Sequence, residues 1–384
     1  MFGNYFNGKR ILVTGVSGVK GTWLTLMLLH AGAIVTGLDK RLAALRSNFS
    51  ATGLGGRINF ILGDVRDLVL VRRLVEDADC VFHLAAEAIV GEAVRNPLEA
   101  YSSNTLGTAT MLEALRLVGP PKRAVFITTD KVYKEKPAGE LWDESDELGA
   151  TGPYAVSKAC AEWVIRDYNR CYFASTETKL AVARAGNVLV GGDDHASSTS
   201  HGAGRIFVDC YEALTEGRAP EIFQPAFTRP YTYGLDILSG YMSLMSQLDR
   251  EGIAGEAFNF GPYEQLGVSN ALLATKICEL WGTGVLWKGG FPREEPFEYQ
   301  ALRTDKSQHR LGWRPAFTLY EALRDTTTWY KAWAGLGSNI TEGCMYALNC
   351  SLITDHRAAA ARLGVHWACG EQESLPQAAG SDPM

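Results

Sequence analysis

Arg10-Ile-Leu-Val-Thr14, continued directly by Gly15-Val-Ser-Gly18-Val-Lys-Gly21, decides the fold of this chain. The first segment predicts a short buried strand, and the apolar run from Trp23 to Leu29 predicts a helix after the turn. In this order the glycines permit a tight turn and a close backbone approach to a pyrophosphate, while the helix N-terminus offers free N–H groups to the anion. We therefore expect a bound dinucleotide to contact Gly15, Ser17, Gly18, Val19 and Gly21.

The second predicted strand, Ala33 to Gly37, points to the identity of that dinucleotide. It ends in Leu38-Asp39, about 20 residues beyond the turn, where an acid can accept hydrogen bonds from both ribose hydroxyls of NAD. Lys40 and Arg41 would instead favour the 2′-phosphate of NADP. The carboxylate would repel that phosphate, so NAD is the expected cofactor.

Short apolar strands and helices alternate along the next part of the chain. Strands are predicted near 58–62, 80–86, 124–128 and 180–185, with helices such as 68–76 and 105–117 between them. This alternation predicts an α/β fold of Rossmann type, a doubly wound parallel sheet covered by helices on both faces. Ligands bind such sheets at the carboxyl ends of the strands.

Residues near those strand ends complete the expected cofactor site. We expect Asp64 and Val65 near the adenine, and the backbone around Ala85 near the pyrophosphate or the nicotinamide ribose. Ordinary strand exits remain the alternative interpretation, above all for Asp64. The full set expected beyond the turn and Asp39 is Asp64, Val65, Leu84, Ala85, Ala86, Asn104, Thr128, Tyr154 and Lys158.

Composition excludes several other classes of protein. The chain has 384 residues, of which 46% are hydrophobic, so it can bury a large core in one elaborated domain or two lobes. Its net charge of −6 gives no electrostatic footprint for nucleic acid, and no apolar run predicts a membrane span. Eight cysteines without paired spacing indicate reduced thiols in a cytoplasmic protein, and no spacing is typical of a metal site.

Tyr154 and Lys158 are candidate catalytic residues. They stand four apart in an alanine-containing segment that favours a helix, so both side chains should lie on one face. There the ammonium and an oxidised nicotinamide would favour the phenolate, making Tyr154 a base for a sugar hydroxyl. The same pair is also common on helix surfaces. Thr129, at a predicted strand end, favours the catalytic interpretation because its hydroxyl can hold the same substrate oxygen.

Asp130 and Lys131 follow Thr129 directly and add a second chemical function. A plain dehydrogenase needs a hydroxyl, a tyrosine and a lysine, but no further acid or base. The extra carboxyl and amine imply a second proton transfer, which suggests elimination of water after oxidation. A solvated turn after the strand is the alternative interpretation.

At this point the chain resembles the extended short-chain dehydrogenase/reductase family, and within it the nucleotide-sugar dehydratases, above all the CDP-glucose 4,6-dehydratases. The resemblance covers roughly residues 6–335 and weakly extends to about 360. The Thr-Asp-Lys triplet is its most specific part, because related dehydratases typically carry Thr-Asp-Glu. The motifs that carry it begin at Thr14, His83, Thr128, Pro153, Ala183, Leu238, Phe258 and Leu311.

The resemblance implies a mechanism for the matching residues. Tyr154, assisted by Thr129 and Lys158, would remove the proton from O4 while C4 passes hydride to NAD. Lys131 would then take the C5 proton while Asp130 protonates O6 and water leaves. Hydride would return to C6, giving a 4-keto-6-deoxy sugar nucleotide and regenerating NAD. Lys131 must be neutral and Asp130 protonated for these roles, which an ion pair between them opposes unless they titrate as a unit.

The second half of the chain is expected to hold the substrate. We predict an NAD-binding domain at 1–188 with a strand return near 235–262, a mainly substrate-binding C-terminal lobe at 189–335, and an extension at 336–384. Arg229 resembles the family arginine that binds the diphosphate, for which a planar fork is well suited. Surface arginines are the alternative interpretation. The expected substrate-binding residues are Asn187, Arg205, Arg229, Tyr233 and Arg293.

Departures from the family pattern lie in this substrate region. The family usually reads Gly-Gly-Gly-Asp-Trp, Arg-Pro-Trp-Gln-His and Ser-Tyr where this chain has different residues at 190–195, 229–233 and 91–94. A different base or sugar in the substrate is therefore an open alternative.

Two segments are expected to be mobile. The run Ser197 to Gly204 is expected to form a mobile lid, and the tail from about 363 is expected to be flexible.

Two rival functions stay open. A nucleotide-sugar 4-epimerase or decarboxylase would use the same Thr129, Tyr154 and Lys158 but has no need for Asp130-Lys131. A non-catalytic NAD-binding scaffold would be expected to lose a member of the triad, and none is lost. In each case the partner is a small molecule, with a homodimer or homotetramer as the expected assembly.

Overall fold

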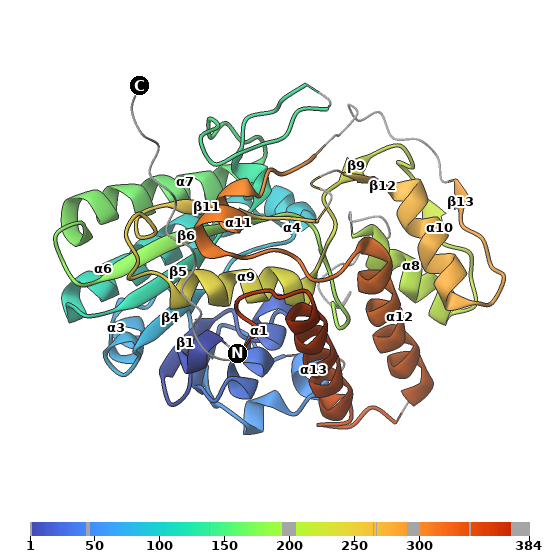
Figure 1. The fold of residues 1–384 in the computed structure, drawn as a ribbon, viewed down its shortest axis with the longest axis horizontal. Helices are drawn as coiled ribbons and strands as arrows, with labels where there is room; N and C mark the ends of the chain where they lie inside the picture. The colour runs from blue at the N-terminus through green and yellow to red at the C-terminus, as the bar shows by residue number, and fades with distance from the viewer. Residues whose placement is uncertain are drawn as a thin grey trace.

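The computed structural model describes residues 2–43, 47–137, 139–193, 205–263, 265, 267–289, 300–337 and 339–369. It has a large α/β body and a smaller lobe at its side (Figure 1). The lid and Arg293 expected from the sequence lie outside the described residues.

The body is built on a seven-stranded sheet in the order β11-β6-β5-β4-β1-β2-β3. Every neighbouring pair is parallel. The order reverses at β1, which confirms the doubly wound arrangement, and the predicted strands fall within a few residues of the observed ones. The strands are β1 Arg10–Thr14, β2 Ile34–Asp39, β3 Asn59–Leu62, β4 Cys80–His83, β5 Arg123–Ile127, β6 Lys179–Ala185 and β11 Ala257–Phe260.

Both faces of the sheet are buried, which explains why its strands are almost continuously apolar. In β1, Ile11 and Val13 belong to one hydrophobic cluster, whereas Leu12 belongs to the cluster on the opposite face. The alternation repeats in β4, where Phe82 and Val81 face opposite ways.

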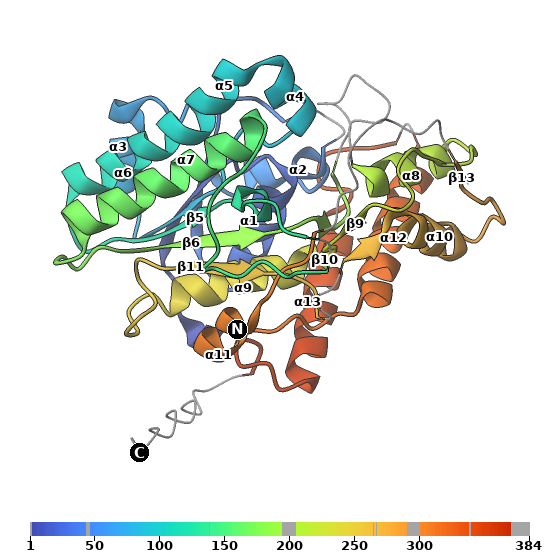
Figure 2. The same cartoon turned by 90° about the horizontal axis from the view of Figure 1, so that it is seen from above.

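Two helical layers cover these faces (Figures 1 and 2). The helix predicted at 105–117 starts as a π-helical turn, Ser102–Leu106, before α6 begins. One layer contains α3 Leu68–Glu76, α4 Val90–Arg95, α5 Pro97–Tyr101, α6 Gly107–Val118 and α7 Pro153–Tyr168; the other contains α1 Val19–His30, α9 Gly234–Ser246, α11 Asp305–Leu311 and α13 Tyr346–Arg362.

The smaller lobe stands beyond the carboxyl ends of the strands, where α8, α10 and α12 pack together (Figure 2). Short strand pairs connect it to the body. Its elements and connectors are α8 Ile206–Thr215, α10 Asn270–Trp281, α12 Leu319–Leu336, β7 Val188–Leu189, β8 Glu221–Ile222, β9 Thr228–Arg229, β10 Thr232–Tyr233, β12 Val268–Ser269 and β13 Lys288–Gly289.

The C-terminal extension closes onto the body. His356 of α13 lies 2.8 Å from the Asp236 carboxylate, which also accepts the backbone N–H groups of Ala316 and Phe317. We expected a flexible tail from about 363, but Trp367 is buried and stacks on Phe2, while its carbonyl accepts the Phe2 N–H. The rest of the tail, from residue 370, lies outside the described residues.

A buried ion pair connects α7 to the sheet. Arg184 of β6 donates from Nε to both Glu162 carboxylate oxygens, at 2.9 and 3.1 Å, and both side chains are fully buried. Thr128, at the end of β5, donates its hydroxyl to Glu162 at 2.7 Å. Arg184 also donates to the Tyr133 hydroxyl, which in turn donates to Asn259 of β11. This network fixes α7 against the ends of three neighbouring strands.

Glu162→Gln removes the charge that compensates Arg184 and should lower the free energy of unfolding by about 3–5 kcal/mol, measured by urea denaturation. A matched control on the same helix is Asp167→Asn, whose partner Arg170 is exposed. That control should change the free energy by less than about 1 kcal/mol. Equal effects of the two substitutions would contradict the anchoring role of Glu162.

Candidate functional site

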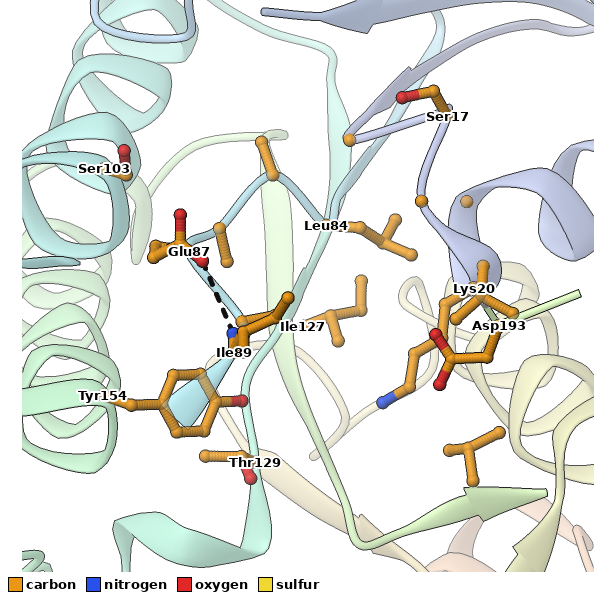
Figure 3. A pocket seen from close by; sticks show the side chains of 18 of the residues that line it. Ser17, Lys20, Leu84, Glu87, Ile89, Ser103, Ile127, Thr129, Tyr154 and Asp193 are labelled. Carbon is orange, nitrogen blue, oxygen red and sulfur yellow. Dashed lines mark hydrogen bonds between the residues drawn. The ribbon is translucent and has the colours of Figure 1, made fainter. Parts of the chain in front are cut away.

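A single cavity of about 1260 Å³ runs along the carboxyl ends of the strands. It begins at the turn before α1 and the end of β2, passes the ends of β4 and β5, and reaches the base of the smaller lobe. Figure 3 shows part of its lining, with side chains from the α1 turn, the loop after β4 and α7. Most of the predicted cofactor, catalytic and substrate residues line this one space.

The turn before α1 exposes its backbone because it contains glycines, which have no side chain. Gly15 has a φ of 69°, and a Cβ there would lie 2.8 Å from the Ala85 nitrogen. A Cβ on Gly21 would lie 2.2 Å from the Gly15 carbonyl oxygen. Glycine is therefore required at both positions, and the first turn of α1 faces the cavity as expected for a pyrophosphate site. These features fit a dinucleotide.

Asp39 lines the cavity at the end of β2. Its carboxylate accepts hydrogen bonds from the Ser17 backbone N–H at 3.1 Å and from the Ser17 hydroxyl at 2.7 Å. Asp64 also lines this end of the cavity, and hydrogen bonding from Arg66 lowers its pKa. Lys40 contacts Glu99 at 2.6 Å, so its ammonium is already paired and is less available to a 2′-phosphate.

Thr129, Tyr154 and Lys158 meet at the other end of the cavity. The Thr129 hydroxyl, just beyond β5, and the Tyr154 phenol of α7 lie together in Figure 3. Burial raises the pKa of Tyr154 to about 12, opposed by the hydrogen bond with Thr129. Lys158 donates to the Ile127 carbonyl at 2.7 Å, and burial lowers its pKa to about 8. A cation bound nearby would lower the pKa of the phenol further.

The next turn places Asp130 and Lys131 beside this triad. Thr129 caps the short helix Asp130–Val132, accepting the Lys131 N–H at 3.3 Å. The Asp130 side chain is 2% exposed and accepts the Thr129 hydroxyl at 3.0 Å. Its charge acts on the Tyr154 phenol, and Lys131 lines the same cavity. Asp130 is thus a buried acid next to Thr129 and Tyr154 rather than part of a solvated turn.

Asn104 has a different position from the one expected. It is fully buried and does not appear among the described residues that line the cavity. Its side chain accepts the Glu87 N–H at 2.7 Å and donates to the Glu87 carbonyl and to the Ser157 hydroxyl. Asn104 therefore holds the loop after β4 against α7 and acts on the site through Glu87, whose side chain faces the cavity.

Asn187, Arg205 and Arg229, three of the expected substrate-binding residues, line the end of the cavity next to the smaller lobe. Arg205 forms an ion pair with Asp193. Tyr233 was predicted here but is a core residue, because it immediately precedes α9 and stacks on Phe317 at a ring distance of 4.9 Å. Tyr231, two residues earlier, lines the cavity in its place.

Sequence reasoning missed several other cavity residues, namely Lys20, Glu87, Asp193 and Tyr231. Lys20 stands inside the glycine-rich segment, at the predicted N-terminus of a helix. A cation is unfavourable there, so the lysine itself is a sequence signal for a functional role. Within the ranges described, no helix is long and apolar enough to cross a membrane, and no cluster of three His, Cys, Asp or Glu side chains is suited to a metal.

Comparison with known proteins agrees with this geometry. The family model described as the NAD dependent epimerase/dehydratase family matches residues 11–261. The chain is 33% identical to CDP-glucose 4,6-dehydratase from Salmonella typhimurium, over 86% of this chain and 92% of that protein.

Solved structures show the same fold. A dTDP-glucose 4,6-dehydratase from Streptomyces venezuelae with NAD bound has a TM-score of 0.73 and 26% identity, covering 86% of this chain and 100% of that one. UDP-glucose 4-epimerase from Thermotoga maritima also has a TM-score of 0.73, at 25% identity over 84% of this chain and 98% of that one. The matched fold, the bare glycine turn and the Asp39 site lead to one conclusion: this chain belongs to the NAD dependent epimerase/dehydratase family.

Proposed function

We propose that this protein is a nucleotide-sugar 4,6-dehydratase that converts an NDP-hexose, with CDP-D-glucose as the first candidate, to the NDP-4-keto-6-deoxyhexose. The observation that carries the proposal is the buried Asp130 beside Thr129 and Tyr154, with Lys131 on the same turn. Oxidation at C4 alone would need neither Asp130 as an acid nor Lys131 as a base.

The oxidation half uses the groups on β5 and α7. Bound NAD supplies the hydride acceptor and donor, and is regenerated in each turnover. Thr129 holds the O4 hydroxyl and Tyr154 removes its proton. Lys158 supplies positive charge that favours the phenolate. Its buried ammonium is held in place by the Ile127 carbonyl, so it cannot turn away into solvent.

The elimination half uses the turn after β5. Once C4 is a ketone the C5 proton is acidic, and Lys131 takes it while Asp130 protonates O6 and water leaves. Asp130 must be protonated for this step, and its carboxyl is buried beside the Thr129 hydroxyl rather than in bulk water. The Thr129 hydroxyl contacts Asp130, so the two halves share one residue.

A 4-epimerase or decarboxylase is the alternative within the family, since epimerases match the fold as closely. Neither reaction needs a buried acid and a base next to the triad, so Asp130-Lys131 argues against both. A non-catalytic scaffold is disfavoured because Thr129, Tyr154 and Lys158 are all present and face the cavity.

The nucleotide and the sugar are tested with a panel of CDP-, UDP-, dTDP- and GDP-hexoses. Arg229 and Arg205 suit the diphosphate, which every member of the panel shares. We expect one nucleotide hexose to lose one water and to give the alkali-induced chromophore of a 4-keto-6-deoxy sugar, without net accumulation of NADH. Steady stoichiometric NADH formation would instead indicate a simple dehydrogenase.

Two further properties belong to this proposal. We propose a homodimer or homotetramer, since α5, the turn before α6, and α7 carry exposed apolar side chains on one side of the body: Leu98 is 83% exposed, Leu106 54% and Trp163 58%. We also propose a cytoplasmic location, in keeping with eight cysteines that form no disulfide. Light scattering of the purified protein tests the first.

Asp39→Ala should weaken NAD binding by roughly tenfold or more and should affect NADP binding less. The reason is that only NAD has a free 2′-hydroxyl that can donate a hydrogen bond to this carboxylate. Calorimetric titration of both dinucleotides measures the change. Ser17→Ala is a useful control, since it removes one hydrogen bond to Asp39 but keeps the charge. Tighter binding of NADP than of NAD to the unmutated protein would refute the ribose argument.

Tyr154→Phe and Lys131→Ala should separate oxidation from elimination. Tyr154→Phe removes the O4 base and should abolish both cofactor reduction and product formation. Lys131→Ala should permit C4 oxidation but reduce product formation by roughly 10²–10⁴-fold, since only the C5 base is missing. Rapid-mixing absorbance of reduced cofactor and incorporation of solvent deuterium at C5 measure the two steps.

Lys134→Ala is the matched control for Lys131→Ala, because Lys134 pairs with Glu147 on the surface just beyond the same turn. It should leave both steps unchanged. Near-normal turnover with full deuterium incorporation at C5 in Lys131→Ala would assign the C5 proton to another group.

A further inference from the structure

Lys20 is a cavity residue with no role in the steps above. It lies in the first turn of α1, and Figure 3 shows its side chain extending into the cavity beside Asp193. No hydrogen bond or ion pair joins its ammonium to any of the residues that the structure describes. Its charge acts on Asp130, Asp193 and Lys158, so the ammonium lies at the reaction end of the cavity rather than at the Asp39 end.

This position is unfavourable for a lysine on three counts. Burial lowers the pKa of Lys20 to about 8, although Asp130 and Asp193 oppose that change. The N-terminus of α1 carries the positive end of the helix dipole. Lys158, which is buried, is a second cation within electrostatic range of the half-buried Lys20. A cation kept where the surrounding structure disfavours it indicates that its charge acts on a ligand.

The charges around Lys20 do not cancel. Asp193 is neutralised by its ion pair with Arg205. Asp130 faces Lys20 from the turn after β5, and Lys20 in turn acts on Lys158. When Asp130 is protonated, neither of the two carboxylates that act on Lys20 offsets its charge, because Asp193 is paired with Arg205.

We propose that the Lys20 ammonium stabilises the reduced form of the bound cofactor relative to the oxidised form. The oxidised nicotinamide ring carries a positive charge and the reduced ring is neutral, so a nearby cation disfavours only the oxidised form. Lys20 thus favours removal of hydride from the substrate. It is a positioning residue that acts through charge, and the inference requires the cofactor family but not the dehydratase reaction.

The test is the ratio of reduced to oxidised cofactor on the protein, with no sugar nucleotide present. Each variant is equilibrated with mixtures of NAD and NADH, and the bound forms are released and quantified by chromatography. Lys20→Met should lower the bound NADH-to-NAD ratio by roughly tenfold, the order expected for one unit charge in a partly buried site. Lys20→Arg keeps the charge and should stay within about twofold of the unmutated protein.

Lys40→Met is the control at the other end of the cavity, where the ammonium is paired with Glu99. It should leave the ratio unchanged even if both affinities fall. Thermal unfolding establishes that each variant is folded. An unchanged ratio in Lys20→Met would overturn the proposal. Equal weakening of both cofactor forms would also overturn it, since that result assigns Lys20 to the pyrophosphate.

Discussion

The buried pair of Glu162 and Arg184 is the interaction on which the site depends. The site combines segments far apart in sequence: Thr129 lies just beyond β5, while Tyr154 belongs to α7. Glu162, on α7, accepts hydrogen bonds from Arg184 on β6 and from Thr128 just beyond β5, so one carboxylate fixes the helix against both strands. A buried ion pair contributes little net stability compared with apolar side chains of similar volume, but loss of one partner leaves an uncompensated buried charge.

The same hydrogen-bond network reaches the turn that carries Asp130 and Lys131. Arg184 also holds the Tyr133 hydroxyl, which is bonded to Asn259, so the turn that carries Asp130 and Lys131 is fixed at its far end as well as by the Thr129 cap. The turn therefore holds a buried carboxyl in a defined position beside the Thr129 hydroxyl.

The sequence was sufficient for the sheet and the cofactor turn because both rest on local signals. Apolar strands such as Arg10–Thr14 are buried on both faces, and Gly15 and Gly21 are required by contacts with neighbouring backbone. Tyr233 was assigned to the substrate site from a motif, but a shift of two residues turns a side chain from cavity to core. The packing of Tyr233 on Phe317 and His356, both from distant segments, distinguishes it from Tyr231.

Asn104 and Lys20 show the same limit. Asn104 acts through Glu87 and Ser157, partners that its sequence neighbours do not reveal. Lys20 stands within the glycine-rich turn of the sequence, but its neighbours Asp130 and Asp193 come from segments more than 100 residues away. The segments that differ from the family pattern likewise did not identify the base or the sugar of the substrate. Side chains from several loops together select these groups.

The most direct measurement follows a deuterium label placed at C4 of the accepted nucleotide hexose. The account predicts a product one water lighter, with the deuterium at C6, because hydride leaves C4 and returns to the carbon that loses its hydroxyl in the same site. A product of unchanged mass, inverted at C4 and still labelled there, would contradict it. In that case Asp130 and Lys131 would have no part in elimination, and the protein would be an epimerase.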